Sequence, residues 1–109
     1  ISRRFRMRLD DYQQQARATM RAGLSPRDAL LDAAAGLSEE AGEVLSHVRK
    51  HAFFDQALDP TAVKEELGDA LWCIAAVATD LGLSLGDVAA ANLRKIEHRA
   101  RAQGKSDSD

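Results

Sequence analysis

Residues 39–45 read Glu-Glu-Ala-Gly-Glu-Val-Leu, and residues 65–71 repeat the pattern as Glu-Glu-Leu-Gly-Asp-Ala-Leu. An α-helix turns by about 100° per residue, so acidic residues three positions apart share one face. The apolar residues around each stretch also recur at helical spacing, and they lie beside the acidic residues rather than opposite them. We therefore expect two amphipathic helices that pack through their apolar faces and bring their carboxylates together.

Capping signals on both sides of these stretches predict four helices. Alanine and leucine, both strong helix formers, supply 20 and 13 of the 109 residues. Ser25-Pro26, Asp59-Pro60 and Ser84 are typical helix starts, and Gly23, Gly82 and Gly104 are typical ends. The expected helices span about residues 10–22, 26–50, 60–81 and 85–102.

Short connections between long helices favour antiparallel neighbours. The predicted fold class is therefore all-α, an antiparallel four-helix bundle. The expected domain covers residues 9–103, between a basic N-terminal extension at residues 1–8 and a frayed tail at residues 104–109. Only 5% of the residues are aromatic and many core positions are alanine, so a single chain buries little apolar area. We expect the bundle to be completed by oligomerisation.

The composition excludes several classes of protein. A charged fraction of 29% with 45% apolar residues is that of a globular domain rather than a disordered tail. The longest apolar run, residues 70–78, is far shorter than the roughly 20 residues of a membrane span, so no membrane partner is expected. A net charge of −2 argues against nucleic acid as a partner. The single cysteine, Cys73, lies in that apolar run, which predicts a buried thiol in a cytoplasmic protein.

The carboxylates of the two similar stretches form a chemically demanding group. Glu40, Glu43, Glu66 and Asp69 border the apolar faces, where ionised carboxylates repel one another and lose hydration. A divalent cation relieves both problems, and an all-oxygen ligand set suits Mg²⁺, with Mn²⁺ as an alternative. Such ions commonly bridge to phosphate oxygens. The alternative interpretation is a pair of solvated acidic faces on alanine-rich helices.

The same residues resemble a known family. The pattern Glu39-Glu40-x-x-Glu43, followed by Glu66-x-x-Asp69, is similar to the paired acidic motif of the MazG-like, all-α nucleoside triphosphate pyrophosphohydrolases. Residues 36–44, 66–72 and 92–96, together with Arg99 and the Tyr12-Gln13 pair, also resemble that family. The similarity extends over about residues 9–100.

The resemblance implies hydrolysis of a nucleoside triphosphate to the monophosphate and pyrophosphate, with Mg²⁺, in a homodimer or homotetramer that clears unwanted nucleotides. The metal ligands implied are Glu40, Glu43, Glu66 and Asp69. Glu39 lies about 100° around the helix from Glu40; by similarity it orients or deprotonates the attacking water. Two alternatives are a phosphoribosyl-ATP pyrophosphohydrolase of histidine biosynthesis and a non-catalytic helical dimerisation module.

The predicted fourth helix carries polar and cationic side chains that can bind phosphate. Asn92 falls within its apolar arc, and Lys95 and Arg99 lie on the adjacent flank. We expect these three residues to border the core and bind the triphosphate, because Lys and Arg recognise phosphate and Asn orients it. The alternative is that Asn92 caps a neighbouring helix and the two cations are solvated.

Three further features have two interpretations each. The segment at residues 51–55 either stacks on a nucleobase or plugs the end of the bundle. Trp72 marks either a subunit interface or a base pocket. His47, one turn after Glu43, lies beside the metal or has no role. Gly42 and Gly68 indicate close approach of another helix, within the chain or across an interface.

Overall fold

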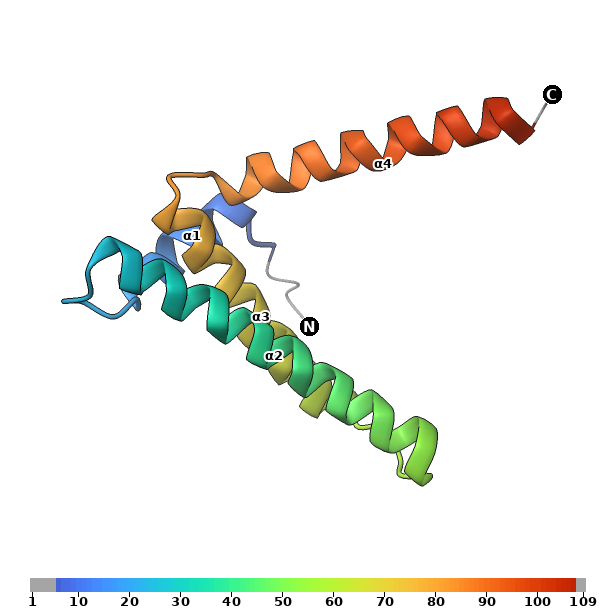
Figure 1. Cartoon of the computed structure of the whole chain (residues 1–109), viewed down its shortest axis with the longest axis horizontal. Helices are drawn as coiled ribbons and strands as arrows, with labels where there is room; N and C mark the ends of the chain where they lie inside the picture. The colour runs from blue at the N-terminus through green and yellow to red at the C-terminus, as the bar shows by residue number, and fades with distance from the viewer. Residues whose placement is uncertain (1–5, 108–109) are drawn as a thin grey trace.

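The computed structural model describes residues 6–107, which form four α-helices and contain no β-strand. The predicted all-α class is confirmed. Figure 1 shows α2 and α3 running side by side in opposite directions, with α1 against the far end of α3 and α4 leaving that end. The helices are α1 (Leu9–Ala18), α2 (Pro26–Phe54), α3 (Pro60–Asp80) and α4 (Leu85–Asp107).

Three helices begin at the predicted caps. The Ser25 Oγ atom accepts a hydrogen bond from the Asp28 N–H at 3.1 Å, and Asp59 Oδ1 accepts one from the Thr61 N–H at 3.0 Å. At the third start, Ser84 Oγ accepts from the Asp87 N–H at 3.1 Å. Each bond pairs a backbone donor that the helix itself leaves free. Local sequence therefore fixes where α2, α3 and α4 begin.

The predicted helix ends are less accurate. Helix α1 stops at Ala18, four residues before the predicted end, and Thr19 Oγ1 donates a hydrogen bond back to the Ala16 carbonyl at 2.7 Å. Helix α2 includes residues 51–54, which the sequence places outside it, and ends at Asp55, whose φ of 53° is left-handed. Helix α4 continues through Gly104, because one helical glycine costs only about 1 kcal/mol. The predicted frayed tail is therefore helical as far as Asp107.

Among the residues whose burial the structure describes, the core consists of alanines and one cysteine, with Leu85 as the one larger buried side chain. Helices α2 and α3 approach closely at Gly36, where a Cβ atom would lie only 3.0 Å from Cys73 Sγ. The close approach predicted at Gly42 and Gly68 is absent within the described chain, because nothing lies within 4 Å of a Cβ at either position. The buried residues are Ala16, Ala33, Cys73, Ala75, Ala76, Ala78 and Leu85.

Helix α4 does not close the bundle within one chain. Its axis turns by 104° from that of α3, and it packs against α1 near its first turns (Figure 1). Every residue from 90 to 104 is exposed. The expected completion by oligomerisation thus stays a prediction. No single described helix is long and apolar enough to span a membrane; only α3 and α4 together, as a bent pair, have that length and composition.

Candidate active site

Three carboxylates from two helices meet on one side of the α2–α3 pair. Glu40 of α2 and Glu66 and Asp69 of α3 each place one oxygen within 4.8 Å of the other two. Glu66 and Asp69 are one helical turn apart, so both face α2 from the same side of α3. The predicted meeting of acidic residues from neighbouring helices therefore holds for these three residues, which we call the carboxylate cluster.

The electrostatics of Glu40 show that the carboxylate cluster needs a counter-charge. Its Oε2 atom is shielded from solvent and has no hydrogen-bond partner among the described residues. The pKa of Glu40 is raised, first because its carboxyl lies against that of Glu66, then by loss of hydration, and then by the charge of Asp69. An unpaired, shielded carboxylate oxygen beside two more is a donor set that fits Mg²⁺ or Mn²⁺.

The other two acidic residues of the motif lie further out. Glu43 is exposed and does not belong to the carboxylate cluster, although its charge contributes to the raised pKa of Glu40. Glu39 is exposed as well, and it lies on the next face of α2. Its predicted action on a water molecule stays a prediction.

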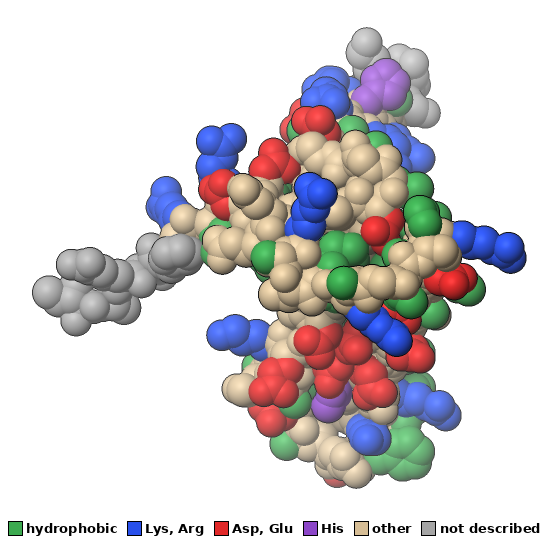
Figure 2. All heavy atoms as spheres, turned by 90° about the vertical axis from the view of Figure 1, so that its left-hand side faces the viewer, with side chains coloured by type: hydrophobic (Ala, Val, Ile, Leu, Met, Phe, Trp, Pro, Cys, Tyr) green, Lys and Arg blue, Asp and Glu red, His purple; other side chains and the backbone are tan. Residues whose placement is uncertain are grey.

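Basic groups are sparse at the carboxylate cluster. In Figure 2 the densest group of Asp and Glu side chains gathers in the lower half of the view. The one ion pair within the described residues joins His47 Nε2 to Glu66 Oε1 at 3.8 Å. No lysine or arginine within salt-bridge distance neutralises the cluster in this part of the chain.

The structure does not bring the predicted phosphate-binding residues to the carboxylate cluster of the same chain. Asn92, Lys95 and Arg99 are all exposed on the part of α4 that points away from α2 and α3 (Figure 1). The prediction that Asn92 borders the core is therefore wrong for a single chain. The physical reason is the direction of α4, which is fixed at its N-terminus by α1.

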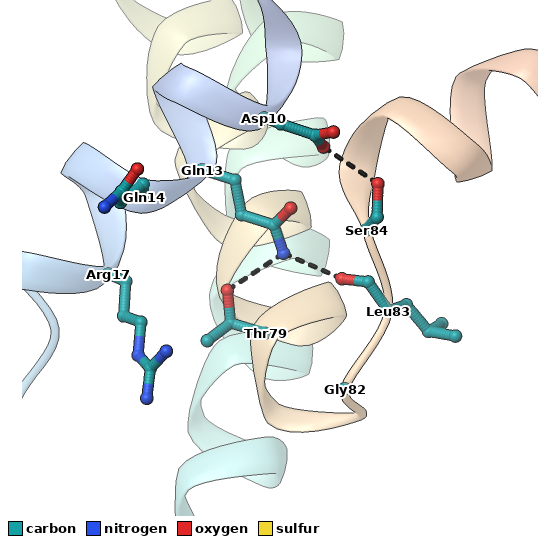
Figure 3. A pocket seen from close by; sticks show the side chains of 8 residues that line it. All are labelled: Asp10, Gln13, Gln14, Arg17, Thr79, Gly82, Leu83 and Ser84. Atoms are coloured by element: carbon teal, nitrogen blue, oxygen red, sulfur yellow. Dashed lines mark hydrogen bonds between the residues drawn. The ribbon is translucent and has the colours of Figure 1, made fainter.

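Two residues of α1 hold the start of α4, and Figure 3 shows them facing the α3–α4 turn. Gln13 Nε2 donates to Thr79 Oγ1 at 3.1 Å and to the Leu83 carbonyl at 2.8 Å, while its Oε1 accepts from the Leu85 N–H at 2.7 Å. Gln13 thereby connects three helices through one amide group.

Asp10 completes this attachment. Its Oδ1 accepts from Ser84 Oγ at 2.8 Å and from the Gly86 N–H at 2.9 Å. These bonds, the one from Gly86 first, lower the pKa of Asp10. A Cβ at Gly86 would lie 3.0 Å from the Asp10 carboxylate, so the contact needs glycine. From the sequence, Asp10 was expected only as the approximate start of a helix. We call Asp10 and Gln13 the α4 clamp.

A mostly apolar cavity of about 170 Å³ opens between α3, the N-terminal half of α2 and the segment after α1. Trp72 forms part of its wall and donates an Nε1–H bond to Thr19 Oγ1, just after α1, at 2.8 Å. The predicted subunit interface at Trp72 stays a prediction. Cys73 lines this cavity and follows Asp69 by one turn of α3, and burial and then the charges of Glu40 and Asp69 raise the pKa of its thiol.

Two other predicted features have clear positions. Phe53 and Phe54 are 76% and 63% exposed in the last turn of α2, so they do not plug the bundle in a single chain. Tyr12 packs on the core from α1, and burial and then the charge of Asp69 raise the pKa of its hydroxyl. Helix α1 therefore contacts both the α4 attachment and the border of the carboxylate cluster.

Comparison with known proteins agrees with this geometry. The model of the MazG nucleotide pyrophosphohydrolase domain matches residues 29–103, which include the carboxylate cluster and most of α4. No curated protein and no solved structure gives a significant match. Because the match covers more than half of the chain, this all-α protein belongs to the MazG nucleotide pyrophosphohydrolase family.

Proposed function

We propose that the protein hydrolyses a nucleoside triphosphate to the monophosphate and pyrophosphate, with a bound Mg²⁺ or Mn²⁺ ion. Glu40, Glu66 and Asp69 are the proposed ligands of this ion, and Glu43 is a further ligand. The observation that supports this most strongly is the shielded, unpaired Oε2 of Glu40 within 4.8 Å of two other carboxylate donors. Clearance of unwanted nucleotides in the cytoplasm is the expected physiological role.

The acidic residues have two proposed roles, ion binding and activation of water, according to their positions. The three residues of the cluster and Glu43 hold the ion and, through it, the polyphosphate. When bound, a divalent ion neutralises the charge that develops as the α–β phosphoanhydride bond breaks. Glu39, on the adjacent face, orients the water and accepts its proton as the oxygen adds to the α-phosphorus. Pyrophosphate is the leaving group.

The apolar cavity beside Trp72 is the proposed site for the nucleobase. Its lining residues Gly36 and Cys73 lie one helical turn from Glu40 and Asp69 on the same faces of α2 and α3, which supports a ligand with its base in the cavity and its phosphates at the carboxylates. A flat, apolar base face suits such a lining. Small residues at Gly36 and Cys73 form part of the wall, and substitution there is expected to change which base is accepted.

A second copy of the chain is the proposed source of phosphate-binding cations. One chain leaves Lys95 and Arg99 exposed and far along α4, while its carboxylate cluster has no lysine or arginine partner among the described residues. Leu93 and Ile96, on the same helix, are more than half exposed. Packing of α4 against a second chain buries these side chains and brings opposite charges together.

The test is a panel of ribo- and deoxynucleoside triphosphates assayed with Mg²⁺, with Mn²⁺ and with a chelator, scored by ³¹P NMR. The expected products from at least one substrate are monophosphate and pyrophosphate, and the chelator stops their formation. Hydrolysis in ¹⁸O-labelled water places the label in the monophosphate if water attacks the α-phosphorus. Release of a nucleoside diphosphate and inorganic phosphate contradicts the proposal. Turnover that the chelator does not affect contradicts it as well.

A further inference from the structure

His47 shares a face of α2 with two acidic residues of the motif. It follows Glu40 by seven residues and Glu43 by four, which are the spacings that align side chains along one side of a helix. Seven residues of α-helix advance by about 10.5 Å. Because α3 runs in the opposite direction, this displacement brings His47 opposite Glu66 rather than Asp69, as the contact with Glu66 shows.

The distance between the two donors lies between the values expected for adjacent and for opposite ligands of one ion. His47 Nε2 lies 3.8 Å from Glu66 Oε1, which is too long for a hydrogen bond. Two donors bound to one ion at about 2.1 Å each are separated by about 3.0 Å at 90° and about 4.2 Å at 180°. The two side chains are 32% and 22% exposed, so an ion in solution can reach both.

We propose that His47 is a nitrogen ligand of the metal site, next to Glu66, and that it shifts the preference of the site from Mg²⁺ toward Mn²⁺. This inference rests on the proposed function in one respect, namely that the carboxylate cluster binds a divalent ion. Mg²⁺ strongly prefers oxygen donors, whereas imidazole is a good ligand for transition-metal ions. His47 lies at the edge of the carboxylate cluster, beside Glu66, and is not among the residues whose ligand atoms all lie within 4.8 Å of one another. An ion that moves toward this edge and gains the imidazole therefore gains more affinity as Mn²⁺ than as Mg²⁺.

A competing explanation is that His47 only pairs with Glu66 and never contacts the ion. The two explanations predict different ligands for the bound ion. A coordinating imidazole gives Mn²⁺ a directly bonded nitrogen, and a paired imidazole does not. They also differ in the effect of removing the ring, because loss of a ligand lowers Mn²⁺ affinity selectively, while loss of a paired group changes the affinity for both ions alike.

The experiment uses the full chain with Mn²⁺ and without nucleotide. Electron spin echo envelope modulation detects ¹⁴N bonded to Mn²⁺, and competition between Mn²⁺ and Mg²⁺ followed by the Mn²⁺ signal gives the ratio of affinities. The variant is His47→Gln, which keeps a polar side chain. The matched controls are His51→Gln and His98→Gln, which change the only other histidines of the chain, one on α2 and one on α4.

The wild type is expected to show nitrogen modulation that disappears in His47→Gln and persists in both controls. The Mn²⁺-over-Mg²⁺ ratio is expected to fall about tenfold or more in His47→Gln, in the range found when groups that tune a metal site are removed. Bound Mn²⁺ without nitrogen modulation, or modulation lost in a control instead, overturns the role of His47 and leaves the proposed function standing. Failure of Mn²⁺ to bind at all overturns both.

Discussion

The α2–α3 pair and the α1–α4 attachment are stabilised in opposite ways. Along α2 and α3, small residues pack closely around Gly36 and Cys73, but the carboxylate cluster beside them includes the unpartnered Oε2 of Glu40 and has no lysine or arginine within salt-bridge distance among the described residues. At the start of α4, the backbone donors find acceptors on Gln13, Asp10 and Ser84, while the rest of the helix exposes apolar and cationic side chains. One region has unpaired acids and the other has unpaired cations. The two deficits are complementary, which supports the proposal that a second copy of the chain completes the site.

The largest effect on hydrolysis is expected from substitutions in the carboxylate cluster. Asp69→Ala removes one of the three clustered oxygens, so hydrolysis is expected to fall by more than about hundredfold, because the ion loses a ligand. Steady-state kinetics of pyrophosphate release measures the loss, and circular dichroism checks that helicity is kept. Glu65→Ala, an exposed acid on the same helix outside the cluster, is the control and should keep full activity. Equal losses in both variants would contradict the assignment.

A second effect tests whether the two regions meet between copies of the chain. Asp69→Ala and Lys95→Ala are each expected to be inactive at low substrate. Unfolding and refolding them together gives mixed dimers in which one of the two sites has intact acids from one copy and an intact α4 from the other. Random pairing then restores about one quarter of wild-type activity. No recovery, in a mixture shown by mass spectrometry to contain mixed dimers, would place both residues in the same chain's site.

An intermediate effect is expected at the α4 clamp. Gln13→Met keeps the length of the side chain but leaves the Leu85 N–H and the Leu83 carbonyl without partners. Urea unfolding is expected to show a loss of about 1 to 3 kcal/mol, the range for removing one partner of part-buried hydrogen bonds. Gln14→Met, at an exposed neighbour on the same helix, is expected to change stability by less than about 0.5 kcal/mol. Similar losses in both variants would mean that Gln13 does not hold α4.

The smallest effect concerns the pH dependence of the ion-free protein. The pKa of Glu40 is raised above its ordinary value of 4.5 in the folded state, so the folded protein binds the proton more strongly than the unfolded chain. Stability is therefore lost as the pH rises from about 4.5 through the folded pKa. Glu40→Gln removes this loss and is expected to melt higher than the wild type at neutral pH in a chelator.

Thermal melts from pH 4 to pH 8 measure the Glu40 effect as the difference between variant and wild type, so contributions from other groups cancel. The difference is expected to grow as the pH rises, and saturating Mn²⁺ should stabilise the wild type more than the variant. A difference that is constant with pH would show that Glu40 carries no unfavourable charge in the folded state.

Local features of the fold were predictable from sequence, and long-range ones were not. Helical periodicity alone predicts that Glu66 and Asp69 share one face of a helix. Capping chemistry predicts that helices begin after Ser25 and Asp59. The direction of α4 depends on bonds between residues more than 70 positions apart, which no local pattern encodes. This is why α4 was expected beside α2 and α3 although it diverges from them.

Within the candidate site, the same distinction separates correct from incorrect predictions. Glu40, Glu66 and Asp69 were correctly expected to meet, because their positions depend on two adjacent helices with a short connection. Asn92, expected at the core border, is exposed in a single chain, because its burial depends on what covers α4. Apolar periodicity identifies a face that needs a partner, but it does not tell whether that partner belongs to the same chain.

Anomalous X-ray diffraction at the manganese edge, from crystals grown with Mn²⁺, locates the ion without any assumption about activity. The predicted result is an anomalous peak bounded by the carboxylates of Glu40, Glu66 and Asp69, and its loss in Asp69→Ala crystals. A map with no peak between α2 and α3, or with Mn²⁺ bound only elsewhere on the chain, would contradict a site built from acidic pairs on two adjacent helices.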